Sequence, residues 1–298
     1  VPKFAAAGFT GGNLIGFLPN GSSIYHGASA QLTHRLTRGF QMSAAYTWSH
    51  LIDDTTAEVF STILSPRRVE DFQNVRRDRA DSALDRRHRF VVSGLYTLPY
   101  FNKADNRFVR TLLGGFNFAG TFTFESGEKA VVRSGIDSNR NGDSAGDRTI
   151  INTSGVRNTF SPVTALKRTD GQTVGYLATN PTAQYIQAGL GALSNAGRNT
   201  LQLPGIRNVD FSIFKNFHVT EGKYFQLRAD LFNALNHPQW TPGSVNGGEA
   251  TSITSGNGAI INNIQANKNL AGGGFFNRPD LDYSSHPRVI QLALRFNF

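Results

Sequence analysis

The C-terminal stretch, residues 288–298, alternates apolar and polar side chains with the period of a β-strand. Its apolar positions are Ile290, Leu292, Leu294, Phe296 and Phe298. A strand with one apolar face that ends on an aromatic residue is typical of a transmembrane β-barrel, in which apolar side chains face lipid and polar side chains face the lumen. This stretch therefore predicts a wall strand of such a barrel.

Six further stretches show the same alternation, and most of them end at turn-forming residues. They are residues 24–35, 40–49, 89–96, 116–124, 208–213 and 225–231. In the fourth stretch, four phenylalanines share one side and small polar residues occupy the other. With the C-terminal stretch, the sequence predicts about seven strands.

The connections alternate in length along the chain. The short or moderate connections are 36–39, 100–113 and 220–223, and the long, irregular ones are 50–85, 126–204 and 236–286. Outer-membrane barrels have short periplasmic turns and long extracellular loops. We therefore predict an all-β fold, an antiparallel transmembrane β-barrel in one domain spanning residues 1–298, with residues 1–22 as loop. Bacterial barrels have an even number of strands, at least eight, so either further strands lie upstream or one lies unrecognised in residues 1–22 or in the long loops. We expect a C-terminal fragment, an open arc whose secretion signal lies upstream.

Composition excludes several classes of protein. The chain has no cysteine, which rules out disulfides, thiolate metal sites and cysteine nucleophiles. No run of apolar residues is long enough for a membrane helix. The net charge is +9, yet the basic residues are spread along the chain except at 76–89, so we expect lipid and not nucleic acid as the partner.

Several motifs, in this order, resemble the C-terminal barrel of TonB-dependent outer-membrane receptors, with the Oar-like branch, which carries a carboxypeptidase-regulatory-like domain, as the nearest. They are Ile24-Tyr-His-Gly27, Tyr46-Thr-Trp-Ser49, Asp85-Arg-Arg-His-Arg-Phe90, Ser126-Gly127, Ala196-Gly-Arg-Asn199, Asn208-Val-Asp-Phe-Ser-Ile-Phe-Lys-Asn-Phe217 and Leu227-Arg-Ala-Asp-Leu-Phe-Asn-Ala-Leu-Asn-His-Pro238. The resemblance covers nearly the whole chain.

This resemblance implies a plugged barrel of about twenty-two strands in the outer membrane of a Gram-negative bacterium, taking up a nutrient with energy from TonB. The plug and the TonB box are expected upstream, so TonB would be contacted only through that region. The resemblance also implies that the outer-membrane assembly machinery recognises the C-terminal strand, 288–298. None of the family's substrate-binding residues is carried over to this chain. The alternative within the same membrane is a surface adhesion or scaffold protein.

One loop carries candidate metal ligands. Oxygen side chains at alternate positions before a glycine are the pattern by which calcium loops supply ligands. The candidates are Asp137, Asn139, Asn141 and Asp143, with Asp147 in place of the missing twelfth-position Glu. The alternative is a solvated loop tip of Asx turns without an ion. Apart from this possible calcium site, we expect no cofactor.

The same loop contains Gly142-Asp-Ser-Ala-Gly146, which matches the nucleophile elbow of serine esterases. That motif needs a strand before Ser144 and a helix after it, and the flanking residues favour neither. A soluble esterase is therefore only a second alternative, and we expect no catalytic residues.

Charged residues near strand ends have two interpretations each. His88 lies within the Asp85–Arg89 cluster, where bracing of the barrel rim is favoured over contact with a ligand. Arg228 and Asp230 fit a salt bridge in the wall and a contact with the plug equally well. Trp240 and Phe275-Phe276, in outer loops, are the aromatic residues that could touch a ligand.

Overall fold

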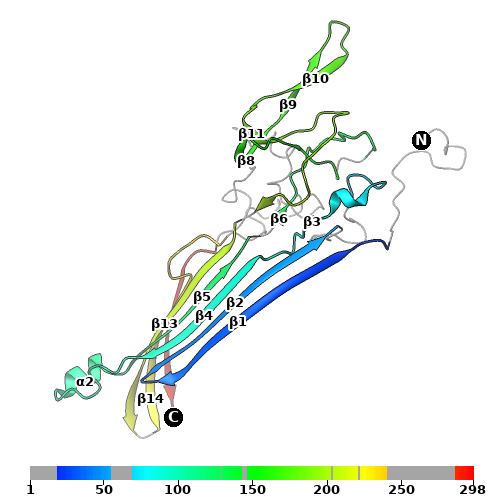
Figure 1. Ribbon diagram of the computed structural model, residues 1–298. Helices are drawn as coiled ribbons and strands as arrows, with labels where there is room; N and C mark the ends of the chain where they lie inside the picture. The colour runs from blue at the N-terminus through cyan, green and yellow to red at the C-terminus, as the bar shows by residue number, and fades with distance from the viewer. Residues whose placement is uncertain are drawn as a thin grey trace, which may run out of the picture.

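A computed structural model describes residues 19–54, 69–127, 129–142, 146–202, 204–220, 222–239 and 286–298. Seven long strands form one antiparallel sheet (Figure 1). In spatial order they are β1 (Ser23–Thr37), β2 (Phe40–Asp53), β4 (His88–Thr97), β5 (Phe116–Glu125), β13 (Ile206–Thr220), β14 (Lys223–Phe232) and β15 (Val289–Asn297). The two-residue β3 (Ala80–Asp81) pairs with the far end of β2. The predicted all-β antiparallel fold and its seven strands are confirmed.

The sheet is open, because β1 and β15 form its two edges and are not paired with each other. Each long strand pairs with the next one along the chain, so all the connections are of the hairpin type. The C-terminal strand pairs with β14 as predicted, with Leu294 opposite Leu227 and Ile290 opposite Leu231.

Neighbouring cross-strand rows show that the two faces of the sheet differ. One row is apolar and consists of Phe40, Tyr96, Phe118, Ile213, Ala229 and Leu292. The next row lies on the opposite face and consists of Gln41, Leu95, Ala119, Ser212, Asp230 and Gln291. We call these the apolar face and the polar face. Successive side chains alternate between them, as a pleated strand requires.

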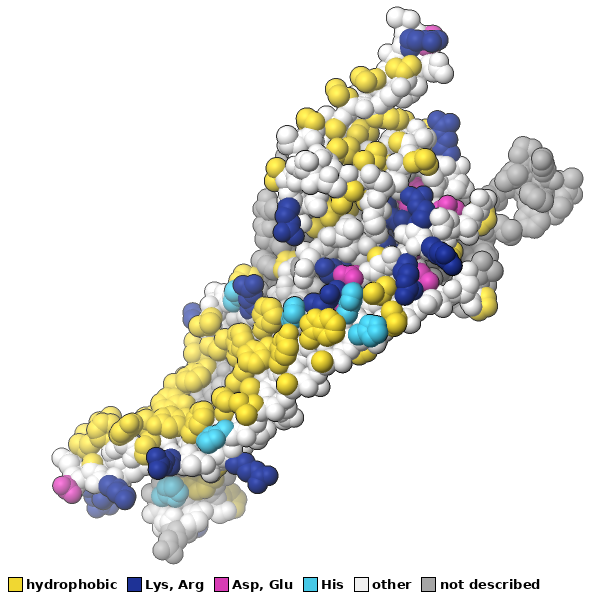
Figure 2. Space-filling view, viewed as in Figure 1, with side chains coloured by type: hydrophobic (Ala, Val, Ile, Leu, Met, Phe, Trp, Pro, Cys, Tyr) yellow, Lys and Arg dark blue, Asp and Glu magenta, His cyan; other side chains and the backbone are white. Residues whose placement is uncertain are grey.

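No layer of the described residues covers the β14–β15 part of the apolar face, where Leu292 is 76% exposed and Leu294 is 71% exposed. Figure 2 shows the hydrophobic side chains of the sheet as a continuous band with basic side chains and histidines along its borders. We call this band, from the row of Phe40 to the row of Phe90, the apolar belt. Among the described residues, no helix has the length and hydropathy to cross a membrane.

The β1–β2 hairpin shows why the sheet has tight turns at one end. Thr37 pairs with Phe40, so only Arg38 and Gly39 form the turn, and both have positive φ (52° and 80°). That geometry matches the twist of the flanking strands. A Cβ on Gly39 would also lie 2.7 Å from the carbonyl oxygen of Thr97, so glycine is required there for two reasons.

Three stretches differ from the expectation. The connection 100–113 contains helix α2 (Arg107–Leu113), and the segment 50–85 contains the 3₁₀ helix η1 (Val75–Asp78). The segment 126–204, predicted to be irregular, contains β6 (Lys129–Ala130), β7 (Ile150–Ile151), β8 (Val156–Ser161), β9 (Val163–Lys167), β10 (Thr173–Ala178), β11 (Ala183–Ile186) and β12 (Leu201–Gln202). These strands are short and lack a clean alternation, so pairing between distant segments defines them.

Candidate functional site: the loop module at the long-loop end

The long connections converge at one end of the sheet. Residues 69–85, 129–142 and 146–202 fold together there, and we call them the loop module (Figure 1). Within it, β11 pairs with β7 and β8, and β12 pairs with β6. The buried apolar side chains of the described residues belong to this module and not to the sheet, and include Val132, Tyr185 and Leu201. The module therefore has a small core of its own.

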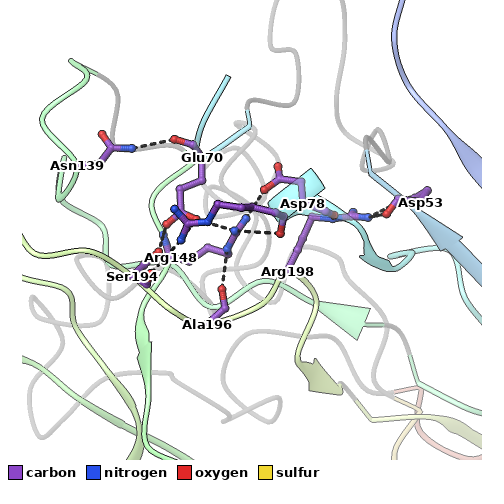
Figure 3. Close-up of polar contacts among 9 residues, drawn as sticks. Asp53, Glu70, Asp78, Asn139, Arg148, Ser194, Ala196 and Arg198 are labelled. Atoms are coloured by element: carbon purple, nitrogen blue, oxygen red, sulfur yellow. Dashed lines mark hydrogen bonds and ion pairs between the residues drawn. The ribbon is translucent and has the colours of Figure 1, made fainter. Parts of the chain in front are cut away.

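Arg148 lies at the centre of the module and is only 2% exposed. Its guanidinium approaches two buried carboxylates: Nη2 lies 2.6 Å from Oε2 of Glu70, and Nη1 donates to Oδ1 of Asp78 (Figure 3). Its Nε donates to the carbonyl oxygen of Ala196 at 2.9 Å. Glu70 and Asp78 precede Arg148 by 78 and 70 residues, so one side chain joins two separate loops.

Arg198 fastens the module to the sheet. Its Nε donates to the carbonyl oxygen of Asp78 at 2.6 Å, and its Nη2 donates to the carbonyl oxygen of Asp53 at 2.5 Å and also to the Asp53 carboxylate (Figure 3). Asp53 is the last residue of β2. Since Arg198 is 1% exposed, water does not compete for these contacts.

The Glu70 carboxylate interacts with side chains from both long connections of the module. Besides Arg148, it accepts a hydrogen bond from the hydroxyl of Ser194, and its Oε2 lies 3.4 Å from Arg77. Arg77 in turn donates to the carbonyl oxygen of Ser194 at 2.9 Å. We call Asp53, Glu70, Asp78, Arg148 and Arg198 the buried ion network. Each of its charges is paired, as burial of a charge requires.

A second layer of ion pairs follows the rim of the sheet. Asp81 accepts from His50 at 2.8 Å and lies 3.2 Å from Arg87, while Arg86 lies 3.1 Å from Glu125. These arginines form a charge network of the kind in which His88 was expected to take part. His88 differs, because its Nδ1 is hydrogen-bonded to the hydroxyl of Tyr46 at 2.8 Å on the apolar face.

Three of the predicted calcium ligands, Asp137, Asn139 and Asn141, fall in a tight turn at the surface of the module. The Asp137 carboxylate accepts from the backbone N–H groups of Asn141 and Gly142, both at 2.9 Å. The Asn139 side chain accepts from Asn141 N at 3.0 Å and donates to the carbonyl oxygen of Glu70 at 2.8 Å. These are the contacts of an Asx turn.

A fourth predicted ligand, Asp147, is fully buried and accepts a hydrogen bond from Ser138 N at 2.8 Å. Asp143 and Ser144 lie outside the described residues, so neither the complete calcium set nor the esterase serine is placed. Within the described part of the chain, no three His, Cys, Asp or Glu side chains are grouped to hold a metal ion. Calcium binding by Asp137, Asn139, Asn141, Asp143 and Asp147 stays a prediction, and Trp240 and Phe275-Phe276 also lie outside the described residues.

On the polar face, Arg228 donates from Nε to Oδ1 of Asp230 at 2.7 Å, and Asp230 also accepts from Ser212 Oγ at 2.5 Å. Of the two interpretations of this pair, the structure contains the salt bridge in the wall.

Sequence patterns did not identify Glu70, Arg148 or Ser194. Arg198 stood in the quoted motif Ala196-Gly-Arg-Asn199, but nothing local assigned it a role. The available signal was weak: arginines and carboxylates in loops are usually solvated, and only the fold shows that these are buried.

Residues 4–266 match the family model described as an outer membrane beta barrel domain. No curated protein and no solved structure matches the chain significantly.

Proposed function

The chain belongs to the outer membrane beta barrel domain family. We propose that it forms part of the wall and the mouth of a receptor that imports a solute, as TonB-dependent receptors do. Family membership places it in the outer membrane of a Gram-negative bacterium and confirms the predicted transmembrane β-barrel. The apolar belt is then the lipid-facing surface, and the polar face lines the lumen. The long-loop end, with the loop module, faces outward.

The observation that carries the import proposal is the buried ion network. An outward-facing loop that only shields a barrel has no need of a packed core or of buried charges, which are costly to desolvate. Here Arg148 and Arg198 join two loops to each other and to the end of β2, which pre-organises the mouth. A pre-organised surface lowers the entropic cost of binding and so favours capture of a scarce solute.

The polar face supports a passage for water-soluble molecules. Small or hydrogen-bonding side chains occur on it along four adjacent strands, and include Ser43, Ser93, Thr121 and Ser212. Coupling to TonB belongs to the same proposal and rests on the resemblance of the motifs.

The growth of bacterial cells on a limiting nutrient tests the import proposal. The gene is deleted and restored, as wild type or as Arg198→Ala, in cells that must take up a limiting nutrient at low concentration. Import predicts slower growth of the deletion strain, rescue by wild type, weaker rescue by Arg198→Ala, and loss of the advantage when TonB is deleted. Equal growth of all strains on every limiting nutrient would refute it.

Surface adhesion is the second candidate, favoured by the β9–β10 hairpin. This hairpin projects from the module (Figure 1) and exposes apolar side chains, with Leu166 47%, Val174 64% and Leu177 60% exposed. Adhesion predicts that Val174→Ser/Leu177→Ser reduces attachment of cells to a surface or to one another without changing growth on the limiting nutrient. Import predicts no change in attachment.

A further inference from the structure

The connection between β4 and β5 is ordered although it lies at the end of the sheet with tight turns. Its helix, α2, begins after Asn106, whose side chain accepts from the backbone N–H groups of Phe108 and Val109. Asn102 closes the connection: its Oδ1 accepts from Gly115 N at 2.6 Å, and its Nδ2 donates to the carbonyl oxygen of Leu98 at 3.2 Å. The polypeptide is thus held in a defined shape.

The side chains of α2 are not buried by the rest of the described chain. None of its seven residues is buried, and Phe108 is 72%, Leu112 52% and Leu113 42% exposed. Isolated helices of this length are unstable in water, because their stability in proteins comes mainly from packing of an apolar side. The described residues therefore give the helix little of this stabilisation, and its apolar side is available to a surface beyond them.

The residues of α2 divide between two sides. Phe108 and Leu112, four apart, share one side of the helix, with Val109 and Leu113 next to them, while Arg107, Arg110 and Thr111 lie opposite. Lys103, just before the helix, is exposed as well. In the part of the chain that the structure describes, neither arginine has a carboxylate partner. Basic and apolar sides on one helix are the pattern of helices that lie in a membrane interface.

Lys215 connects α2 to the apolar belt. It lies on the same face of β13 as Ile213, two residues away, and its Nζ donates to the carbonyl oxygens of Leu112, at 3.0 Å, and Gly114. The ammonium lies 4.6 Å from the ring centroid of Phe116. Figure 2 shows hydrophobic side chains continuing from the belt onto the α2 protrusion, with basic side chains along its lower border. The apolar side of α2 thus extends the lipid-facing surface.

We propose that α2 is an interfacial anchor that binds anionic phospholipids of the periplasmic leaflet. Phe108, Leu112 and Leu113 enter the boundary between headgroups and acyl chains, while Lys103, Arg107 and Arg110 pair with headgroup phosphates. The continuity of the belt with α2 specifies lipid, because a partner protein at this position would have to displace the membrane edge. This inference rests on the outer-membrane location and does not depend on solute import.

Spin labels can measure the depth of α2 directly, since the chain has no cysteine of its own. The full chain is placed in lipid nanodiscs with one cysteine introduced at a time: Leu112→Cys on the apolar side and Thr111→Cys on the basic side. Phe122→Cys in the belt and Thr169→Cys in the tip of the β9–β10 hairpin provide the lipid and water references. A high collision rate with oxygen indicates that the label lies in lipid, and a high collision rate with a water-soluble nickel chelate indicates that it lies in water.

We expect the Leu112 label to resemble the belt reference and the Thr111 label to lie closer to water. Adding phosphatidylglycerol to phosphatidylcholine nanodiscs should increase the lipid-bound fraction. In Arg107→Gln/Arg110→Gln, the ratio of bound to unbound helix should fall about thirtyfold in the anionic membranes, with little change in phosphatidylcholine. Both labelled positions are exposed, so the label does not disturb a packed core.

Three results would overturn the proposal. The first is a Leu112 label that is as accessible to water as the hairpin reference. The second is equal depth for the Leu112 and Thr111 labels. The third is a depth that depends neither on phosphatidylglycerol nor on the two arginines, which would exclude anionic headgroups as the ligand.

Discussion

Replacing Arg148 with alanine should loosen the loop module and leave the sheet intact. Without the guanidinium, Asp78 and Glu70 remain buried, at 1% and 4% exposure, and lose their main cationic partner. Removing one member of a buried ion pair costs about 3–5 kcal/mol. Arg77 stays within 3.4 Å of Glu70 and compensates part of that charge, so the lower bound, about 3 kcal/mol, is expected.

Hydrogen exchange of the refolded protein measures this cost segment by segment. A loss of about 3 kcal/mol speeds exchange through opening of the module by about 150-fold. The amides of β8 and β11 report on the module, and those of β2 and β5 report on the sheet. Arg168→Ala is the matched control, because it removes an ion pair with Asp170 that is exposed, in the same module. It should leave exchange unchanged.

A triple variant distinguishes the two possible causes of this loss of stability, which are an uncompensated buried charge and lost side-chain packing. Arg148→Met/Glu70→Gln/Asp78→Asn removes all three charges at nearly constant volume, and buried ion pairs replaced in this way often lose little stability. Exchange in the module should then return most of the way to the wild-type rate. Unchanged exchange in Arg148→Ala would refute the reasoning, as would equal loosening of β2 and β5, because the network would not then act on the module alone.

Four further predictions concern other parts of the chain. Phe122→Arg on the apolar belt should lower the free energy of unfolding in lipid by about 2–4 kcal/mol, whereas Thr121→Arg on the polar face should be tolerated; urea titration in vesicles measures both. Gly39→Val should slow hairpin formation and reduce assembly, seen as less heat-modifiable protein on gels, because valine resists positive φ. Burial raises the pKa of Tyr185, so its neutral form stabilises the module below the ordinary tyrosine pKa and this contribution is lost as pH rises through the folded value; ultraviolet titration of wild type against Tyr185→Phe should show one tyrosine ionising late. Calcium titration calorimetry should give heat of binding with wild type and none with Asp137→Ala, and no heat with either would exclude the predicted site.

The long strands could be predicted because one face of each strand contacts lipid and the other face contacts the polar lumen. Phe118 and Phe122 on one side of β5, with Thr121 and Thr123 on the other, carry the period of two in the sequence itself. The tight β1–β2 turn was equally local, since Arg38-Gly39 stands between two alternating stretches. In β13, by contrast, only residues 208–213 were predicted of a strand that continues to Thr220, because Phe214 on the polar face and Lys215 on the apolar face interrupt the alternation.

The loop module was not predictable in the same way. Its strands contain two to six residues, too few to establish a period. Its central contacts join Arg148 to Asp78 and Arg198 to Asp53, which are 70 and 145 residues apart. No local pattern specifies such a pairing, because it is set by how two loops pack and not by the properties of either. The Asx turns expected as the alternative to a calcium site are local, and their contacts do form, at Asp137 and Asn139.

Lys215 shows how one basic residue is accommodated on the lipid-facing surface. A lysine in hydrocarbon is unfavourable unless its ammonium reaches polar partners. Here it is 4% exposed, and its partners are carbonyl oxygens at the C-terminal end of α2, where the helix dipole favours a cation. The lysine and the helix thus depend on each other. Lys215→Met should keep the belt apolar but release the end of α2, and the Leu112 label should then become mobile. An unchanged label would mean that Asn102 and the membrane hold the helix without the lysine.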